Sequence, residues 1–66
     1  MNNLLVGKRV RIIGRMFDII GDVMYEPNNP GDCYVLNNVS KTYNTEITYP
    51  DGVRIQNFDI MYPHEK

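Results

Sequence analysis

The sequence is poor in the residues that bind metals or form covalent cross-links. It contains one cysteine, Cys33, and one histidine, His64, among 66 residues. A single cysteine excludes a disulfide within the chain, and four ligands for a tetrahedral metal site are hard to assemble from this composition. We therefore expect no metal and no cofactor. Because a chain this short has a thin core, association with copies of itself is the remaining way to stabilise it.

Long apolar runs, a leader segment and an excess of positive charge are also absent. No run is long enough to span a membrane, and the N-terminus lacks the basic start and apolar core of a signal peptide. We therefore expect a cytoplasmic protein. The net charge of −1 argues against strong non-specific binding to duplex nucleic acid, which needs a basic surface. Paired carboxylates occur without a nearby base or room for a deep cleft, so we expect no enzymatic activity.

The residues that are present predict β-structure. β-branched and aromatic residues dominate, and clusters of Gly, Pro, Asn and Asp recur at short intervals, which is typical of a small sandwich or barrel. Val10 and Ile12 alternate with Arg9 and Arg11, so one side of that strand packs and the other meets water. We predict strands near Lys8–Ile13, Phe17–Tyr25, Asp32–Val39 and Tyr43–Tyr49, and a fifth that begins at Val53.

Two local features refine this prediction. Gly21 falls on the inward side of the second strand, where a missing side chain lets a long strand bend around a small core. In the fifth strand, Val53 and Ile55 share one face, but the apolar residues from Phe58 onward are out of phase by one position. The chain must therefore slip at Gln56–Asn57, by a bulge or by one turn of 3₁₀ helix.

The apolar and glycine pattern resembles the Sm/LSm family, including its bacterial Hfq-type members. The residues that carry the resemblance are Leu4-Leu5-x-Gly7-Lys8-x-Val10-x-Ile12, Gly14-Arg15, Ile19-x-Gly21-x-Val23, Tyr34-Val35-Leu36-Asn37-Asn38-Val39 and Val53-Arg54-Ile55. The resemblance implies an all-β fold over residues 1–66 as a single domain. That fold is a small, strongly bent, five-stranded barrel of the Src-homology-3-like (SH3-like) or Sm-like type, with little or no N-terminal helix.

The same resemblance implies a function and a partner. It implies a homo-oligomeric, ring-like assembly that forms by edge-strand pairing and binds single-stranded RNA or DNA in nucleic-acid processing. In such a ring the long loop would line the central pore. Tyr25, Asn28, Asn29 and Tyr34 surround this loop, where aromatic rings would stack on bases and amides would read their edges. Arg54 would lie near the same pore, where its guanidinium could contact a base or a phosphate. Lys8, Arg9 and Arg11 would contact phosphates on one rim of the barrel.

Other interpretations of these residues stay open. The basic residues of the first strand are also what a solvated, aggregation-resistant edge would carry, in part paired with Asp18 and Asp22. The loop is also what a Pro/Asn turn over packed tyrosines would look like. Val53 to Ile60 resembles the last strands of adaptor-type SH3 barrels, and Gly7-Lys8-Arg9-Val10 suits KOW-type barrels. The alternative function is therefore an SH3-like protein-interaction or assembly module without nucleic-acid binding, although the lack of tryptophan disfavours recognition of proline-rich peptides.

Overall fold

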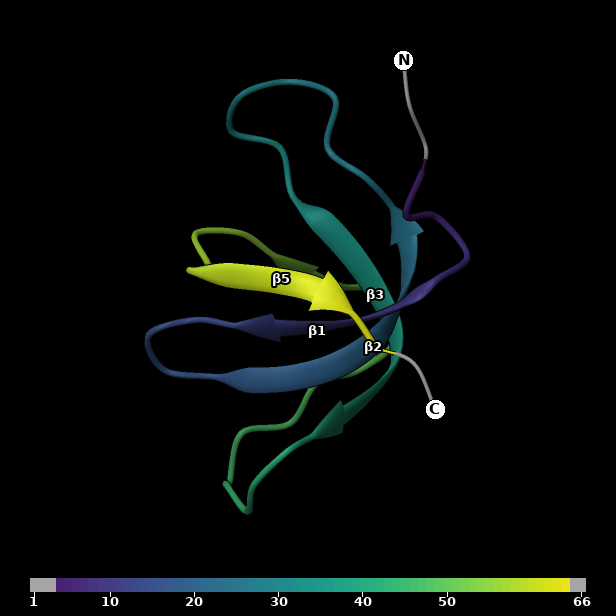
Figure 1. The fold of residues 1–66 in the computed structure, drawn as a ribbon. Coiled ribbons are helices and arrows are strands. Elements are labelled where there is room, and N and C mark those ends of the chain that lie inside the picture. The colour runs from purple at the N-terminus through teal and green to yellow at the C-terminus, as the bar shows by residue number, and fades with distance from the viewer. Residues whose placement is uncertain (1–3, 65–66) are drawn as a thin grey trace.

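The sheet order places consecutive strands at the centre and the last two strands at opposite edges. The computed structural model describes residues 4–64, which form one antiparallel sheet with the order β4-β3-β2-β1-β5 (Figure 1). The strands are β1 (Arg9–Ile13), β2 (Asp18–Tyr25), β3 (Tyr34–Lys41), β4 (Val53–Ile55) and β5 (Ile60–Pro63). The prediction of an all-β fold with five strands and no N-terminal helix is confirmed for residues 4–64. The strand pairs do not include β4 with β5, so closure of the sheet into a barrel stays a prediction.

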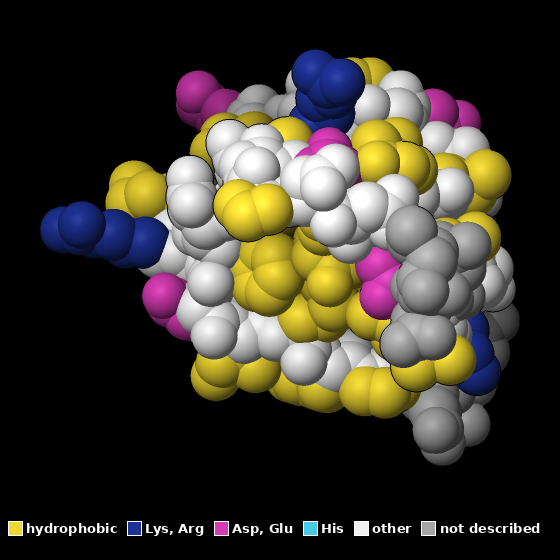
Figure 2. All heavy atoms as spheres, turned by 90° about the horizontal axis from the view of Figure 1, so that it is seen from above, with side chains coloured by type: hydrophobic (Ala, Val, Ile, Leu, Met, Phe, Trp, Pro, Cys, Tyr) yellow, Lys and Arg dark blue, Asp and Glu magenta, His cyan; other side chains and the backbone are white. Residues whose placement is uncertain are grey.

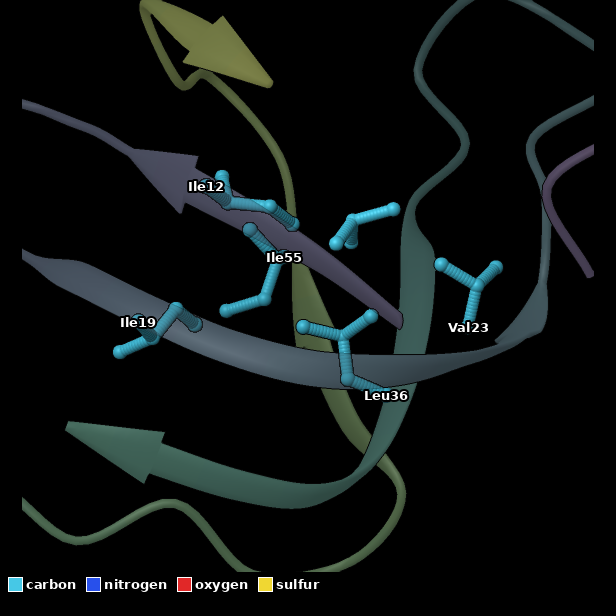
Figure 3. Close-up of a cluster of buried hydrophobic side chains, with 6 residues drawn as sticks. Ile12, Ile19, Val23, Leu36 and Ile55 are labelled. Atoms are coloured by element: carbon cyan, nitrogen blue, oxygen red, sulfur yellow. The ribbon is translucent and has the colours of Figure 1, made fainter. Parts of the chain in front are cut away.

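The core is built from the inward positions of four strands. Its six buried side chains are Val10, Ile12, Ile19, Val23, Leu36 and Ile55. The predicted alternation holds along β1, where Val10 and Ile12 are fully buried and Arg9 and Arg11 lie on the opposite face. Figure 3 shows Ile12, Ile55 and Leu36 approaching one another from β1, β4 and β3. This small cluster is the thin core that a chain of this length can bury.

Gly21 allows β3 to approach β2 closely. A Cβ atom at this position would lie 3.0 Å from Val39 Cγ2 and 3.3 Å from Leu36 Cδ1. The register between β2 and β3 also shifts between Ile20 and Asp22. A glycine at a register shift lets the strand bend without displacing the core. The prediction that Gly21 points inward is confirmed.

The predicted strand at Tyr43–Tyr49 is wrong. The structure has no strand between Lys41 and Val53, although Tyr43, Thr45, Ile47 and Tyr49 alternate as a strand would. Tyr49 packs against the core, whereas Tyr43 is 53% exposed and Ile47 is 47% exposed. Strand propensity is realised only where a segment pairs with a neighbouring strand, and within residues 4–64 this segment pairs with none. The third strand, predicted at Asp32–Val39, begins two residues later, because Asp32 and Cys33 belong to the preceding loop, and it also ends two residues later, at Lys41.

The predicted fifth strand is two strands. The phase slip at Gln56–Asn57 is present, but it is an irregular corner rather than a 3₁₀ turn. Asn57 adopts a left-handed conformation with φ of 58°, which asparagine tolerates better than most residues. The corner sends the chain from β4 at one edge of the sheet to β5 at the other. The slip therefore accompanies the change of sheet edge between β4 and β5, as well as the change in which residues face the core.

Candidate functional site

The loop between β2 and β3 closes around the carboxylate of Asp32. The Tyr25 hydroxyl donates to Asp32 Oδ2 over 2.6 Å, and the backbone N–H of Asn28 donates to the same oxygen over 3.3 Å. The backbone N–H of Cys33 donates to Oδ1 over 2.9 Å. The Asn28 side chain in turn donates to the Tyr25 hydroxyl oxygen over 3.3 Å. A loop rich in proline and asparagine thereby acquires one defined shape.

These donors keep Asp32 ionised. The hydrogen bond from Tyr25 is the main reason that the pKa of Asp32 is lowered from its ordinary value, and the backbone of Cys33 adds to the effect. The same contact raises the pKa of Tyr25, because its proton is held against a carboxylate. A carboxylate that accepts several hydrogen bonds is favoured in its charged form. The loop therefore carries a fixed negative charge at neutral pH.

A hollow of about 280 Å³ lies between this loop and the corner that joins β4 to β5. We call it the end hollow, and its lining residues are Pro27, Asn29, Gly31, Asp32, Tyr34, Ile55, Gln56, Asn57 and Phe58. Tyr34 and Phe58 meet edge to face, with ring centroids 5.6 Å apart and an angle of 65° between the rings. Figure 2, which looks down on this end of the molecule, shows yellow apolar side chains in a hollow among polar atoms, with dark blue basic groups farther out.

Arg54 lies close to the same loop. It pairs with Val35 in the β3–β4 ladder, is exposed, and its positive charge contributes to the lowered pKa of Asp32. Within residues 4–64 its guanidinium makes no ion pair within 4 Å. The structure therefore brings Arg54 close to the loop whose residues Tyr25, Asn28 and Asn29 the sequence also singled out.

Arg9 and Arg11 lie elsewhere, on the outer face of the sheet. We call this the paired face, because Arg9 bonds to Asp22 over 3.0 Å and Arg11 to Asp18 through two contacts of 2.8 and 2.6 Å. Arg9 also donates to the carbonyl of Asn38 over 3.1 Å. The Arg11 guanidinium lies 5.9 Å from the centre of the Tyr62 ring, and its hydrogen bond lowers the pKa of Asp18. Both arginines are thus already engaged by carboxylates within the chain.

Lys8 lines a second hollow of about 320 Å³ together with Arg9, Pro63 and His64. The backbone N–H of His64 donates to the carbonyl of Arg9 over 3.0 Å, which holds the residue after β5 beside the start of β1. The Lys8 side chain is exposed. Of the three basic residues predicted on the first strand, Lys8 is therefore the one without a carboxylate partner among residues 4–64.

The sequence-based site omitted most of the residues that form the end hollow. Gln56, Asn57 and Phe58 reach it only because the corner after β4 folds back toward the loop. The phase slip at Gln56–Asn57 was the available signal, since a corner at the end of a strand places its side chains at the end of the sheet. Asp32 gave no signal of its own, because its importance comes from the donors that the folded loop brings to it.

Residues 4–64 contain no group of three or more His, Cys, Asp or Glu side chains that could hold a metal ion. In the same part of the chain, no helix has the length and apolarity needed to cross a membrane. Searches of protein-family models, curated proteins and solved structures found no match to the chain. The geometry of the end hollow is therefore the basis for a functional proposal.

Proposed function

We propose that the protein binds single-stranded RNA or DNA by taking an unpaired base into the end hollow. The observation that carries the proposal is the meeting of the β2–β3 loop, the aromatic pair Tyr34–Phe58 and Arg54 at one end of the sheet. Aromatic side chains bind unstacked bases of any sequence, and side-chain amides hydrogen-bond to base edges. The hollow offers both kinds of group, since Asn29, Gln56 and Asn57 line it together with the two rings.

The phosphate backbone would be contacted from outside the end hollow. Arg54 is exposed and free of a carboxylate within 4 Å among residues 4–64, and Lys8 is the second such cation named above. Because Arg9 and Arg11 are already paired, few counterions would be released on binding. Two phosphate contacts on a single strand correspond to a slope of about −1.4 in a plot of log affinity against log salt.

Self-association is part of this proposal. Among residues 4–64, β4 and β5 each pair on one side only, and an unpaired edge is a template for another strand. On β5, Ile60 is 52% exposed and Tyr62 is 39% exposed. Pairing of β4 in one copy with β5 in the next would cover both edges and generate a ring-like homo-oligomer. Light scattering at micromolar concentration tests this part, and a strict monomer would refute the ring while leaving base binding to be judged separately.

A second candidate is a protein-interaction or assembly module without nucleic-acid binding. The observation that favours it is the internal pairing of Arg9 and Arg11 on the paired face, in a chain whose net charge is already −1. Such a surface attracts phosphates weakly. The two candidates differ in one simple measurement, which is whether an oligonucleotide binds at all.

Fluorescence anisotropy with labelled oligo-A, oligo-C and oligo-U at 50 and 200 mM salt (values of the order used to resolve such slopes) tests the proposal. We expect Arg54→Ala to weaken binding by about tenfold, as for one charged contact. Arg15→Ala is the matched control, since Arg15 is also exposed but lies in the turn between β1 and β2. Absence of salt-sensitive binding to every oligonucleotide would leave the interaction module as the function.

A further inference from the structure

The end hollow has an unusual charge for a nucleic-acid site. Among its lining residues only Asp32 is charged, and its carboxylate is ionised. A phosphate entering the hollow would be repelled, whereas a hydrogen-bond donor would be attracted. The hollow is therefore suited to a neutral group that carries N–H donors.

The hydrogen bonds of Asp32 leave part of its acceptor capacity unused. A carboxylate offers about four lone-pair positions. Oδ2 accepts from the Tyr25 hydroxyl and the Asn28 backbone, and Oδ1 accepts from the Cys33 backbone. One position on Oδ1 is thus available to a ligand. Since three donors already fix the carboxylate, it need not be reoriented when a ligand arrives.

The other lining groups cannot choose between bases. Asn29, Gln56 and Asn57 each carry both a donor and an acceptor, so their amides can match either pattern on a base edge. Tyr34 and Phe58 present aromatic rings, and every base has a face to pack against them. Asp32 accepts only, and discrimination between bases therefore depends on it.

We propose that the end hollow selects bases that carry an exocyclic amine (adenine, cytosine or guanine) over uracil and thymine, with Asp32 accepting a hydrogen bond from the amine. This inference rests on the proposed base-binding function. Adenine N6 and cytosine N4 are amine donors, whereas uracil carries carbonyl oxygens at O2 and O4 and holds its one base donor, N3–H, between them. A carboxylate that accepts from N3–H therefore also faces a carbonyl oxygen on each side. A carbonyl facing the Asp32 carboxylate would leave two acceptors opposed, which is costly in a partly buried site.

The first test changes the ligand and leaves the protein intact. Anisotropy titrations compare oligo-A, oligo-C and oligo-U of one length with an oligomer of purine riboside, which is adenosine without its 6-amino group. We expect oligo-A and oligo-C to bind about tenfold more tightly than oligo-U, and the purine riboside oligomer to bind as weakly as oligo-U. Equal binding of all four oligomers would overturn the selectivity but not the base-binding function. Absence of binding to all four would overturn both.

The second test changes the acceptor. Asp32→Asn should reduce the preference for oligo-A over oligo-U to within about twofold, and Glu46→Gln should leave it unchanged. Glu46 is an exposed carboxylate in the segment between β3 and β4, away from the end hollow. If Asp32→Asn still binds oligo-A more tightly than oligo-U, another group selects the base. The same follows if the purine riboside oligomer binds as tightly as oligo-A.

Discussion

The paired face and the end hollow both combine aspartate with arginine, but the two regions arrange these residues differently. On the paired face, Asp18 and Asp22 each bond to an arginine of the neighbouring strand. At the end hollow, Asp32 bonds to a tyrosine and to backbone N–H groups instead, and Arg54 remains without a carboxylate within 4 Å among residues 4–64. The first arrangement neutralises charge, and the second leaves a charged acceptor and a charged donor at the surface.

The difference shows that position in the sheet determines what a charged residue can do. Cross-strand neighbours on a sheet face are held at a fixed spacing, so opposite charges there pair with each other. Arg9 and Asp22 are such a cross-strand pair. At a strand end the loop backbone supplies the donors, and the side chains nearby keep the capacity to bind something else. A basic cluster in a sequence is therefore weak evidence of a phosphate site when acidic residues occupy the facing strand.

The largest expected effect comes from a core residue that supports both regions. Leu36 is fully buried and pairs with Val23 on β2 and Val53 on β4. Leu36→Ala should lower the free energy of unfolding by about 2–5 kcal/mol, which is a large part of the stability of so small a domain. Urea denaturation measures the change. Ile47→Ala, at a half-exposed position outside the strands, should stay within about 0.5 kcal/mol, and an equal effect at both positions would contradict the assigned core.

The next effect concerns the loop that forms the end hollow. Tyr25→Phe removes the hydroxyl that bonds to Asp32 over 2.6 Å, so the carboxylate loses its shortest contact and the loop its fixed shape. We expect oligonucleotide affinity to fall by about tenfold, measured by anisotropy. Tyr43→Phe is the matched control on an exposed tyrosine outside the hollow. Equal affinities of the two variants would show that the Tyr25–Asp32 contact does not organise the site.

Acid should affect the paired face in a defined pH range. The hydrogen bond from Arg11 lowers the pKa of Asp18 below its ordinary value of 3.8, so the folded state favours the ionised form. This contribution to stability is fully present above about pH 3.8, and it is lost as the pH falls through the lower pKa of the folded state. Urea denaturation from pH 6 down to about pH 2.5, across the ordinary range of carboxylate titration, should show this loss. Asp18→Asn should flatten the curve in that range, and an unchanged curve would contradict the pairing.

The smallest effect is expected for conservative changes on the paired face. Arg9→Lys and Arg11→Lys keep the charge, but lysine cannot reproduce the two-pronged contact that Arg11 makes with Asp18. Because these guanidinium groups are already engaged within the chain, oligonucleotide affinity should change by less than about twofold. An anisotropy titration in which either variant matched the loss at Arg54→Ala would remove the distinction between the two regions.

Much of the fold could be predicted from local patterns. The alternation of Val10 and Ile12 with arginines, and the inward position of Gly21, depend on the period of a strand, which a sequence displays directly. Tyr43–Tyr49 shows the same period and is nevertheless not a strand. Whether a segment pairs depends on a free neighbouring edge, and alternation carries no information about that edge.

Only part of the candidate site could be predicted, because some of its contacts join residues that are far apart in the sequence. Tyr25, Asn28 and Asn29 lie in one loop, so its composition pointed to them together. The approach of Phe58 to Tyr34 requires the corner at Asn57 to direct the chain back toward that loop. That contact depends on the folded arrangement and has no local sequence pattern. The pairing of Arg9 and Arg11 with Asp22 and Asp18 was instead one of the interpretations open from the sequence, because a hairpin sets the two strands side by side. The register of β1 against β2 confirms it.

The position of β5 has a consequence for how the molecule folds and opens. Pro63 and Met61 pair with Val10 and Ile12, near the other end of the described chain, and β5 contributes no fully buried side chain. Pairing β5 with β1 closes the longest loop in the sheet but buries little apolar surface. We therefore expect β5 to dock late during folding. The amide protons that β1 and β5 share should exchange with solvent before those that join β2 to β3. We therefore expect β5 to be the first strand of the sheet to open.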